Sequence, residues 1–185
     1  ADFLASHEIF RRIGETRSQA VVLQNLGSLY LSARDHERAL RYYAQANETH
    51  KEDAVLSLTA HNNRGSAYKE IGRFQEAERE FKLALAGARS IDSDLLQARI
   101  MSNLAAALIP LGKLAEADAT ARQGLRISQR SAVGWEPYLW GVRAQVAAAR
   151  GDVDGARALM QKAFAGVDLA SSTAPFRDFH EVAHQ

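Results

Sequence analysis

Residues 27–46, GSLYLSARDHERALRYYAQA, and residues 65–84, GSAYKEIGRFQEAEREFKLA, decide the fold because they carry one pattern of small and large residues. Each begins with glycine, has tyrosine three residues later, alanine twelve residues later and an aromatic residue sixteen residues later. The pattern begins again at Ala105 and Ala144, so the four anchor residues are 38, 40 and 39 positions apart. A fixed internal period of this length predicts a repeat architecture.

The alternation of small and large residues predicts that each unit is a helical hairpin. The position twelve residues after the anchor is alanine in all four units: Ala39, Ala77, Ala117 and Ala156. Small residues let two helices approach closely, and larger residues fill the space between them. Glycine seven residues after the anchor, at Gly72, Gly112 and Gly151, predicts a helix end that needs positive φ. The first unit has Arg34 followed by Asp35 there, so we expect its turn to close differently.

The composition indicates a chain that folds around a hydrophobic core, and it favours no charged partner. With 46% hydrophobic residues, a chain of 185 residues can bury a sizeable core. The 23 basic residues nearly cancel the 22 acidic ones, so no overall field attracts nucleic acid or anionic lipid. The sequence contains no cysteine and no apolar run of about 20 residues. We therefore expect a cytoplasmic chain with no cofactor, no membrane partner and no nucleic-acid partner.

The stretches NLGSLYLSARDHERALRYYAQA (25–46) and GSAYKEIGRFQEAEREFKLALA (65–86) resemble tetratricopeptide repeats, and four units in register extend the resemblance over nearly the whole chain. The period exceeds the usual length of about 34 residues. In this respect the chain is similar to the longer-helix variants of kinesin light chains, Gα-binding spindle-orientation adaptors and bacterial peptide-sensing regulators. The resemblance implies an all-α, right-handed solenoid whose first helices line a concave groove and whose second helices cover the outside.

The chain is expected to form one elongated domain over residues 1–185, because each repeat contacts mainly its neighbours. The full units are predicted at 20–53, 58–91, 98–130 and 137–166. Residues 1–15 are predicted to be the second helix of a truncated unit, and residues 171–185 the first helix of another. Since the chain begins without methionine and ends inside a predicted helix, we interpret it as a fragment of a larger protein.

The sequence HEVAH at residues 180–184 matches the zinc-binding pattern HExxH. On a helix, His180 and His184 share a face and can bind zinc, with Glu181 as the general base of a hydrolase. The stretch is in register with the repeat, however, and it has no evident third ligand nearby. We therefore expect no catalytic residue and no metal site, and keep a zinc-dependent hydrolase as the less favoured alternative.

Two polar residues, His61 and Arg64, are predicted to stabilise the fold and not to bind a ligand. His61 shares a column with Leu23, Met101 and Trp140, which predicts a packed core histidine with a local hydrogen bond. Arg64 breaks a leucine column and is predicted to be ion-paired or to extend its head to solvent.

Two groups of charged residues are predicted to lie on solvated helix faces. The run from 73 to 80 alternates basic and acidic residues at helical spacing. Arg122, Arg126 and Arg130 lie on one stripe, where an acidic partner surface is the alternative to solvation.

Asparagine recurs two residues before the anchor, at Asn25, Asn63 and Asn103. Asparagine is unfavourable inside a helix because its side chain competes for backbone hydrogen bonds, so three at one position need a reason. One explanation is a hydrogen bond repeated between units. The other comes from the resemblance: in the longer-helix variants this asparagine lies on the concave face and bonds the backbone of a bound peptide.

We predict a peptide-binding groove around these asparagines. The other predicted members lie near the same helix face: Gln24, Ser28, Asn62, Ser66, Lys69, Arg99, Ser102 and Tyr138. Amides can hold the backbone of an extended peptide, and Lys69, Arg99 and Tyr138 are expected to select its side chains.

The function expected from these observations is protein or peptide binding, without catalysis by these residues. The chain resembles the tetratricopeptide segments that precede output domains in bacterial signalling proteins, such as diguanylate cyclases or helix-turn-helix regulators. That resemblance implies a sensor or docking module within a larger bacterial regulatory protein. The alternative is a self-association module, and we expect a monomer or a weak homodimer formed through the exposed ends.

Overall fold

The computed structural model describes residues 9–10, 12–50 and 52–165, and this part of the chain contains helices and turns but no strand. The helices are α2 (Thr16–Ser32), α3 (His36–Thr49), α4 (Ala54–Glu70), α5 (Phe74–Ser90), α6 (Asp94–Leu108), α7 (Leu114–Ser131), α8 (Glu136–Ala149) and α9 (Val153–Ala165). Residues 9, 10 and 12 are also helical. The predicted helix at 171–185 and residues 1–8 of the predicted helix at 1–15 lie outside the described residues.

Side-chain caps fix where several helices begin. The Asp53 carboxylate accepts hydrogen bonds from the backbone N–H groups of Val55 and Leu56, at the start of α4. Asp35 caps α3 and Ser93 caps α6 in the same manner. Such a cap satisfies N–H groups that have no partner within the helix.

The turns inside the hairpins all close through a residue with positive φ. Gly72, Gly112 and Gly151 have φ values of +75°, +71° and +79°, as the sequence predicts. The expectation for the first unit is wrong, because Arg34 has φ +58° and closes its turn in the same way. The next residue, Asp35, donates its N–H to the Tyr30 carbonyl at 2.8 Å, as Arg73 does to Tyr68 at 2.9 Å. The hydrogen-bond pattern thus imposes the left-handed conformation even without glycine.

The anchor residues bring the two helices of a hairpin together. A Cβ atom added at Gly65 would lie 2.7 Å from the Phe81 ring, so the ring packs directly against the α4 backbone. Ala77 and Ala117, in the alanine column, are fully buried in the largest hydrophobic cluster. The buried hydrophobic residues form three clusters, which lie within and between the hairpins.

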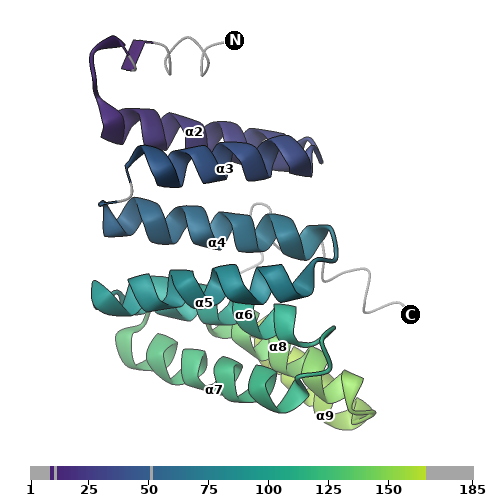
Figure 1. Cartoon of the computed structure of the whole chain (residues 1–185). Helices are drawn as coiled ribbons and strands as arrows, with labels where there is room; N and C mark the ends of the chain where they lie inside the picture. The colour runs from purple at the N-terminus through teal and green to yellow at the C-terminus, as the bar shows by residue number, and fades with distance from the viewer. Residues whose placement is uncertain (1–8, 11, 51, 166–185) are drawn as a thin grey trace.

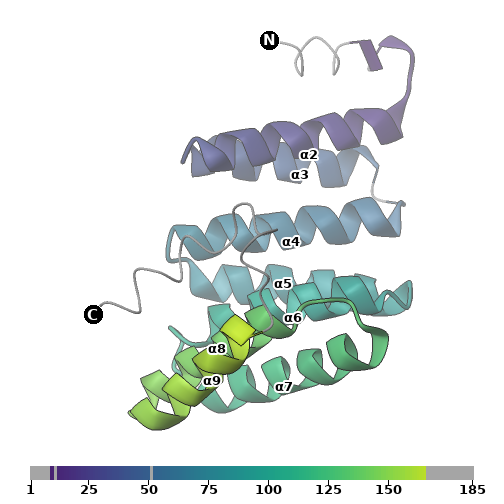
Figure 2. The ribbon, with the colours of Figure 1, turned by 180° about the vertical axis from the view of Figure 1, so that it is seen from behind.

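The hairpins stack side by side in chain order (Figure 1). Each second helix packs against the first helix of the next hairpin, and successive first helices also contact each other. In the described part of the chain, the backbones of successive second helices stay apart, although side chains such as Lys82 of α5 and Glu116 of α7 can pair between them. The first helices α2, α4, α6 and α8 therefore form the inner layer of a right-handed α-solenoid. The stack twists, so α8 and α9 are inclined to α2 and α3 (Figure 2).

The charge run at 73–80 is only partly solvated, which corrects the expectation. Glu78 and Glu80 are buried, with 7% and 9% of their surface exposed. Glu80 forms an ion pair with Arg64 at 3.0 Å and accepts a hydrogen bond from His61 at 2.8 Å. Arg64 is therefore ion-paired, one of the two arrangements predicted for it. Burial of these carboxylates is tolerated because basic groups surround them.

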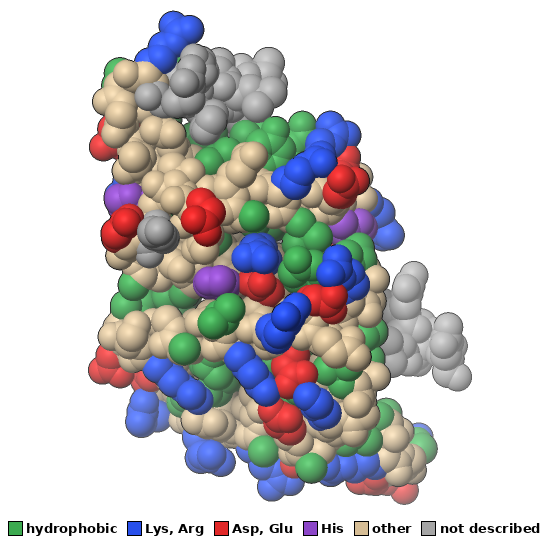
Figure 3. Space-filling model, in the orientation of Figure 1, with side chains coloured by type: hydrophobic (Ala, Val, Ile, Leu, Met, Phe, Trp, Pro, Cys, Tyr) green, Lys and Arg blue, Asp and Glu red, His purple; other side chains and the backbone are tan. Residues whose placement is uncertain are grey.

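Basic and acidic side chains are interspersed on the face shown in Figure 3. Arg122 pairs with Asp118 at 2.7 Å, and Arg130 pairs with Asp94 at 2.8 Å. Two of the three arginines in the predicted basic stripe are therefore already engaged within the chain. This arrangement supports the solvated, ion-paired explanation over an acidic partner surface.

Candidate functional site

Beyond its first turn, helix α6 leaves one stripe of residues accessible. It contacts α4, α5, α7 and α8, which cover its other sides. Between Ala98 and Leu108, the residues that are not buried are Arg99, Asn103 and Ala106. Residues three or four positions apart share one helix face, so these three mark the side that the neighbouring helices do not cover.

The same four positions can be followed on every first helix: six and two residues before the anchor, and one and five residues after it. We call these positions together the inner stripe. Its members are Val21, Asn25, Ser28, Ser32, Thr59, Asn63, Ser66, Glu70, Arg99, Asn103, Ala106, Pro110, Tyr138, Val142, Gln145 and Ala149. All except Val142 are at least partly accessible. Since successive first helices contact each other, these positions form one continuous surface.

Three residues predicted for the groove are instead buried between helices. Gln24, Asn62 and Ser102 have 7%, 7% and 6% of their surface exposed. The Gln24 side-chain amide donates to the Leu56 carbonyl at 2.9 Å, which ties α2 to α4. These side chains are not presented to a partner, because each lies one position before an inner-stripe residue and so points toward the neighbouring helix.

An amide chain links α4 to α6. The Asn103 amide donates to the Asn62 side-chain oxygen at 3.1 Å, and the Asn62 amide donates to the Asn63 side-chain oxygen at 3.4 Å. The hydrogen bond between repeats, one of the two explanations for the asparagines, is therefore present at Asn103. Asn63 and Asn103 nevertheless remain partly accessible, and Asn25 is exposed on α2.

The hydroxyl groups of the inner stripe bond to their own helices. Ser28 donates to the Gln24 carbonyl at 3.1 Å and lies 3.1 Å from the Tyr43 hydroxyl. Ser66 donates to the Asn62 carbonyl at 3.2 Å. These bonds leave small polar side chains lying close to the helix surface.

The three residues expected to select side chains differ in their surroundings. Lys69 and Tyr138 are partly buried, and the Tyr138 ring packs against Trp135 at 4.6 Å between centroids. Arg99 is partly buried too, but its Nε is buried without a hydrogen-bond acceptor. Burial lowers the pKa of the Arg99 guanidinium. The Nε of Arg64 is also buried without an acceptor, but the Arg64 guanidinium pairs with Glu80, whereas no ion pair to a described residue balances Arg99. A partly buried cation without such a pair is unusual, since buried charges are normally paired.

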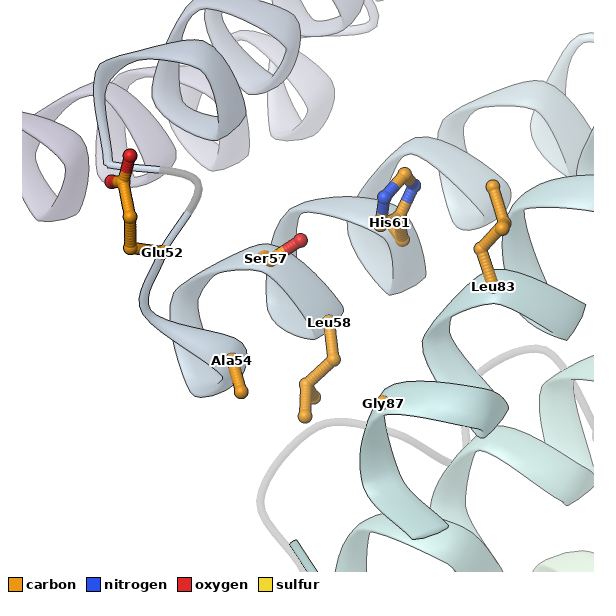
Figure 4. Close-up of a pocket in the computed structure, with 7 residues that line it drawn as sticks. All are labelled: Glu52, Ala54, Ser57, Leu58, His61, Leu83 and Gly87. Atoms are coloured by element: carbon orange, nitrogen blue, oxygen red, sulfur yellow. The ribbon is translucent and has the colours of Figure 1, made fainter. Parts of the chain in front are cut away.

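A cavity of about 270 Å³ lies between α4 and α5 (Figure 4). His61, Leu83 and Gly87 contribute to its wall, and Leu83 is 53% exposed. The sequence predicts a core histidine with a local hydrogen bond. His61 has such a bond, with Glu80, but it is only partly buried and lies at the edge of the cavity. The sequence carries no signal for this cavity, because its shape depends on how closely α5 approaches α4.

The HExxH pattern at 180–184 lies outside the described residues. Within residues 9–10, 12–50 and 52–165, no group of three or more histidine and acidic residues is arranged to hold a metal ion. No helix in the same ranges has the length and apolar character required to cross a membrane.

Two segments of the chain match models of a known protein family. A tetratricopeptide-repeat family model matches residues 56–130, and a second tetratricopeptide-repeat model matches residues 22–55. Together the two matches run over more than half of the chain. The chain belongs to the tetratricopeptide-repeat family. Repeats of this family imply a scaffold for protein–protein interaction. The two layers of helices described above are built from such repeats.

The chain is also similar to one bacterial regulator. It is 38% identical over 77 residues to the regulatory protein AfsR of Streptomyces coelicolor, a match that covers 42% of this chain and 8% of AfsR. The chain therefore corresponds to a small part of that relative.

Solved structures share the fold. BtubC (BKLC) from P. vanneervenii superposes with a TM-score of 0.72 at 18% identity, over 95% of this chain and 77% of that protein. A Signal Transduction ATPase with Numerous Domains from Pyrococcus horikoshii, which has a tetratricopeptide repeat sensor, gives 0.75 at 21% identity, over 88% and 26%. The MamA protein gives 0.61 at 16% identity, over 94% and 96%. At these identities the likeness concerns the fold alone.

Proposed function

We propose that this tetratricopeptide-repeat chain is a docking module whose partner, a protein segment or peptide, lies along the inner stripe. The observation that supports the proposal is the accessible stripe of α6 between Ala98 and Leu108, which continues on α2 and α4, where it presents mainly small polar side chains. An amide donates and accepts hydrogen bonds at once, so Asn25, Asn63 and Asn103 suit the backbone of an extended chain.

We also propose that the chain is part of a larger bacterial regulatory protein. The match to AfsR supports this role, because that relative is a regulatory protein and is much longer than the matched stretch. A sensor or partner-docking role fits a solenoid that offers an extended surface.

The test uses peptides selected from a random display library for binding to this chain. Replacing Asn25, Asn63 and Asn103 together with alanine should weaken the selected peptides by about tenfold to a thousandfold, from about 0.5–1.5 kcal/mol per lost hydrogen bond. Dissociation constants are measured by calorimetry, and melting temperatures are measured on the same samples.

The matched control replaces three exposed amides of the outer helices, Gln45, Gln75 and Gln123, with alanine. This control should leave the dissociation constants unchanged. If the two triple variants bind the selected peptides equally well, the inner stripe is not the docking surface. If the asparagine variant melts far lower yet its folded fraction still binds the same peptides, the asparagines act as ties between repeats.

Self-association is a second candidate, favoured by apolar residues at the start of the solenoid. Ile9, Ile13 and Leu29 are each more than half exposed, at 58%, 65% and 53%. Exposed apolar surface of this kind can be buried between two copies. Light scattering over a concentration series decides the matter, since a constant monomer mass excludes this function.

A further inference from the structure

Arg99 is the one cation of the inner stripe, and nothing in the described residues neutralises it. The stripe contains only one other ionisable side chain that is charged at neutral pH, Glu70, and this carboxylate lies 3.3 Å from His36. Within the described residues no hydrogen bond or ion pair engages Arg99, and burial lowers the pKa of its guanidinium. The inner stripe therefore carries at its centre a positive charge that no carboxylate of the described residues balances.

Other arginines on the first helices show what the fold does with a partly buried guanidinium when it serves stability. Arg64 on α4 pairs with Glu80 at 3.0 Å, and Arg143 on α8 pairs with Asp118 at 2.9 Å. Both lie one position before their anchor and so face another helix of the solenoid. Arg99 lies on the accessible stripe and lacks such a carboxylate, although burying an unpaired charge is costly.

We propose that Arg99 receives the carboxylate of an aspartate or glutamate side chain within a peptide bound along the inner stripe. The proposal rests on the docking function proposed above and specifies its ligand. A guanidinium can donate two parallel hydrogen bonds to a carboxylate, which gives both affinity and a fixed register.

The position of Arg99 favours an acidic side chain within the peptide over a terminal carboxylate. The stripe continues past Arg99 on both sides, to Thr59 and Asn63 on α4 and to Tyr138 on α8. Because first helices α4, α6 and α8 contact each other in sequence, a bound chain can extend in both directions from Arg99. Its neighbouring residues would meet uncharged side chains.

The experiment selects peptides from a random library fused at its carboxyl end to a phage coat protein, so that no peptide has a free terminal carboxylate. Wild-type chain should enrich aspartate or glutamate at one position, and Arg99→Gln should lose this enrichment. For a selected peptide, changing the acidic residue to its amide should weaken binding to wild type by about tenfold to a hundredfold, and binding to Arg99→Gln by much less.

The matched control is Arg126→Gln, which removes one exposed positive charge from the outer helix α7 and should keep the acidic preference. Melting temperatures provide a second measurement: Arg99→Gln should melt no lower than wild type, since it removes an unpaired, partly buried charge. Binders without an enriched acidic position, or an enrichment that survives Arg99→Gln, would overturn the assignment of Arg99 while leaving the docking function intact. If the library yields no binder at all, both proposals fail.

Discussion

Gly27 and Gly65 illustrate how single residues set the distance between paired helices. A Cβ atom at Gly27 would lie 2.5 Å from the Tyr43 ring, and one at Gly65 would lie 2.7 Å from the Phe81 ring. The third unit has alanine at its anchor and also at the facing position, Ala121, and both are fully buried. Anchor and facing residue therefore change together, from glycine with an aromatic ring to alanine with alanine, and the close packing is kept.

The Arg34 turn offers a direct test of backbone strain. Left-handed backbone costs a residue with a side chain about 1–2 kcal/mol, whereas glycine adopts it freely. Arg34→Gly also raises the entropy of the unfolded chain, which offsets part of the gain. We expect the free energy of unfolding to rise by about 0.5–1 kcal/mol, measured by urea denaturation.

A control distinguishes this effect from glycine substitution in general. Arg79 is exposed in the middle of α5, where Arg79→Gly should lower the free energy of unfolding by about 1 kcal/mol. Equal destabilisation by both variants would show that the φ of +58° at Arg34 carries no strain.

The neighbouring residues Asn62 and Asn63 show where sequence reasoning about the site stops. The period locates both near the inner face, and it predicts the hairpins, three buried alanines of the repeated column and the glycines at three of the four positive-φ turns inside the hairpins. Adjacent helical residues point about 100° apart, however, so a small rotation of α4 decides which one is accessible. That rotation is set by α6, through contacts between residues about 40 positions apart such as the bond between Asn103 and Asn62. A single sequence does not fix such contacts.

At the scale of elements, the junction between α5 and α7 is held by a buried carboxylate. Glu78 on α5 accepts hydrogen bonds from Lys113, the residue that precedes α7, at 2.7 and 2.9 Å. Lys82 donates to the same carboxylate at 2.7 Å and also pairs with Glu116 on α7 at 3.2 Å. The bonds of Glu78 to Lys113 and of Lys82 to Glu116 cross from one hairpin to the next, where the backbones of α5 and α7 stay apart.

We expect this junction to weaken in acid. Burial raises the pKa of Glu78, but the hydrogen bonds from Lys113 and Lys82 outweigh it, so the pKa lies below its usual value. A carboxylate with a lowered folded pKa stabilises the fold above its unfolded pKa of about 4.3, and this stability is lost as the pH falls through the folded pKa. Glu78→Gln should therefore cost about 1–2 kcal/mol at pH 7 and progressively less below about pH 4.

The measurement is the difference in unfolding free energy between wild type and Glu78→Gln at several pH values. Glu37 provides the control, because its ion pair with Arg41 stays within the exposed surface of α3. Glu37→Gln should have a smaller effect at pH 7, as exposed pairs are weak. A difference for Glu78→Gln that does not change between pH 7 and pH 3 would show that the charge of Glu78 is not what holds the junction.

At the scale of the whole molecule, stability depends on how many neighbours each helix has. Leu29 on α2 is 53% exposed, whereas the equivalent residues Ala67, Ala107 and Val146 are buried. These later positions are covered because a preceding hairpin packs against them. In a solenoid, interactions between adjacent repeats supply much of the stability, so helices with fewer covered faces should open first.

The last prediction concerns the order in which the helices open. Helix α9 has one buried residue, Ala163, while α5 has seven and α6 has nine, and α5 and α6 supply most of the largest hydrophobic cluster. Amide hydrogens of α2 and α9 should therefore exchange with solvent before those of α5 and α6 under native conditions, as followed by mass spectrometry of peptic fragments. A peptide bound along the inner stripe should slow exchange in α2, α4 and α6 together, because it bridges helices that otherwise open separately. Equal protection across α2, α5, α6 and α9 would mean that the chain opens as one cooperative unit.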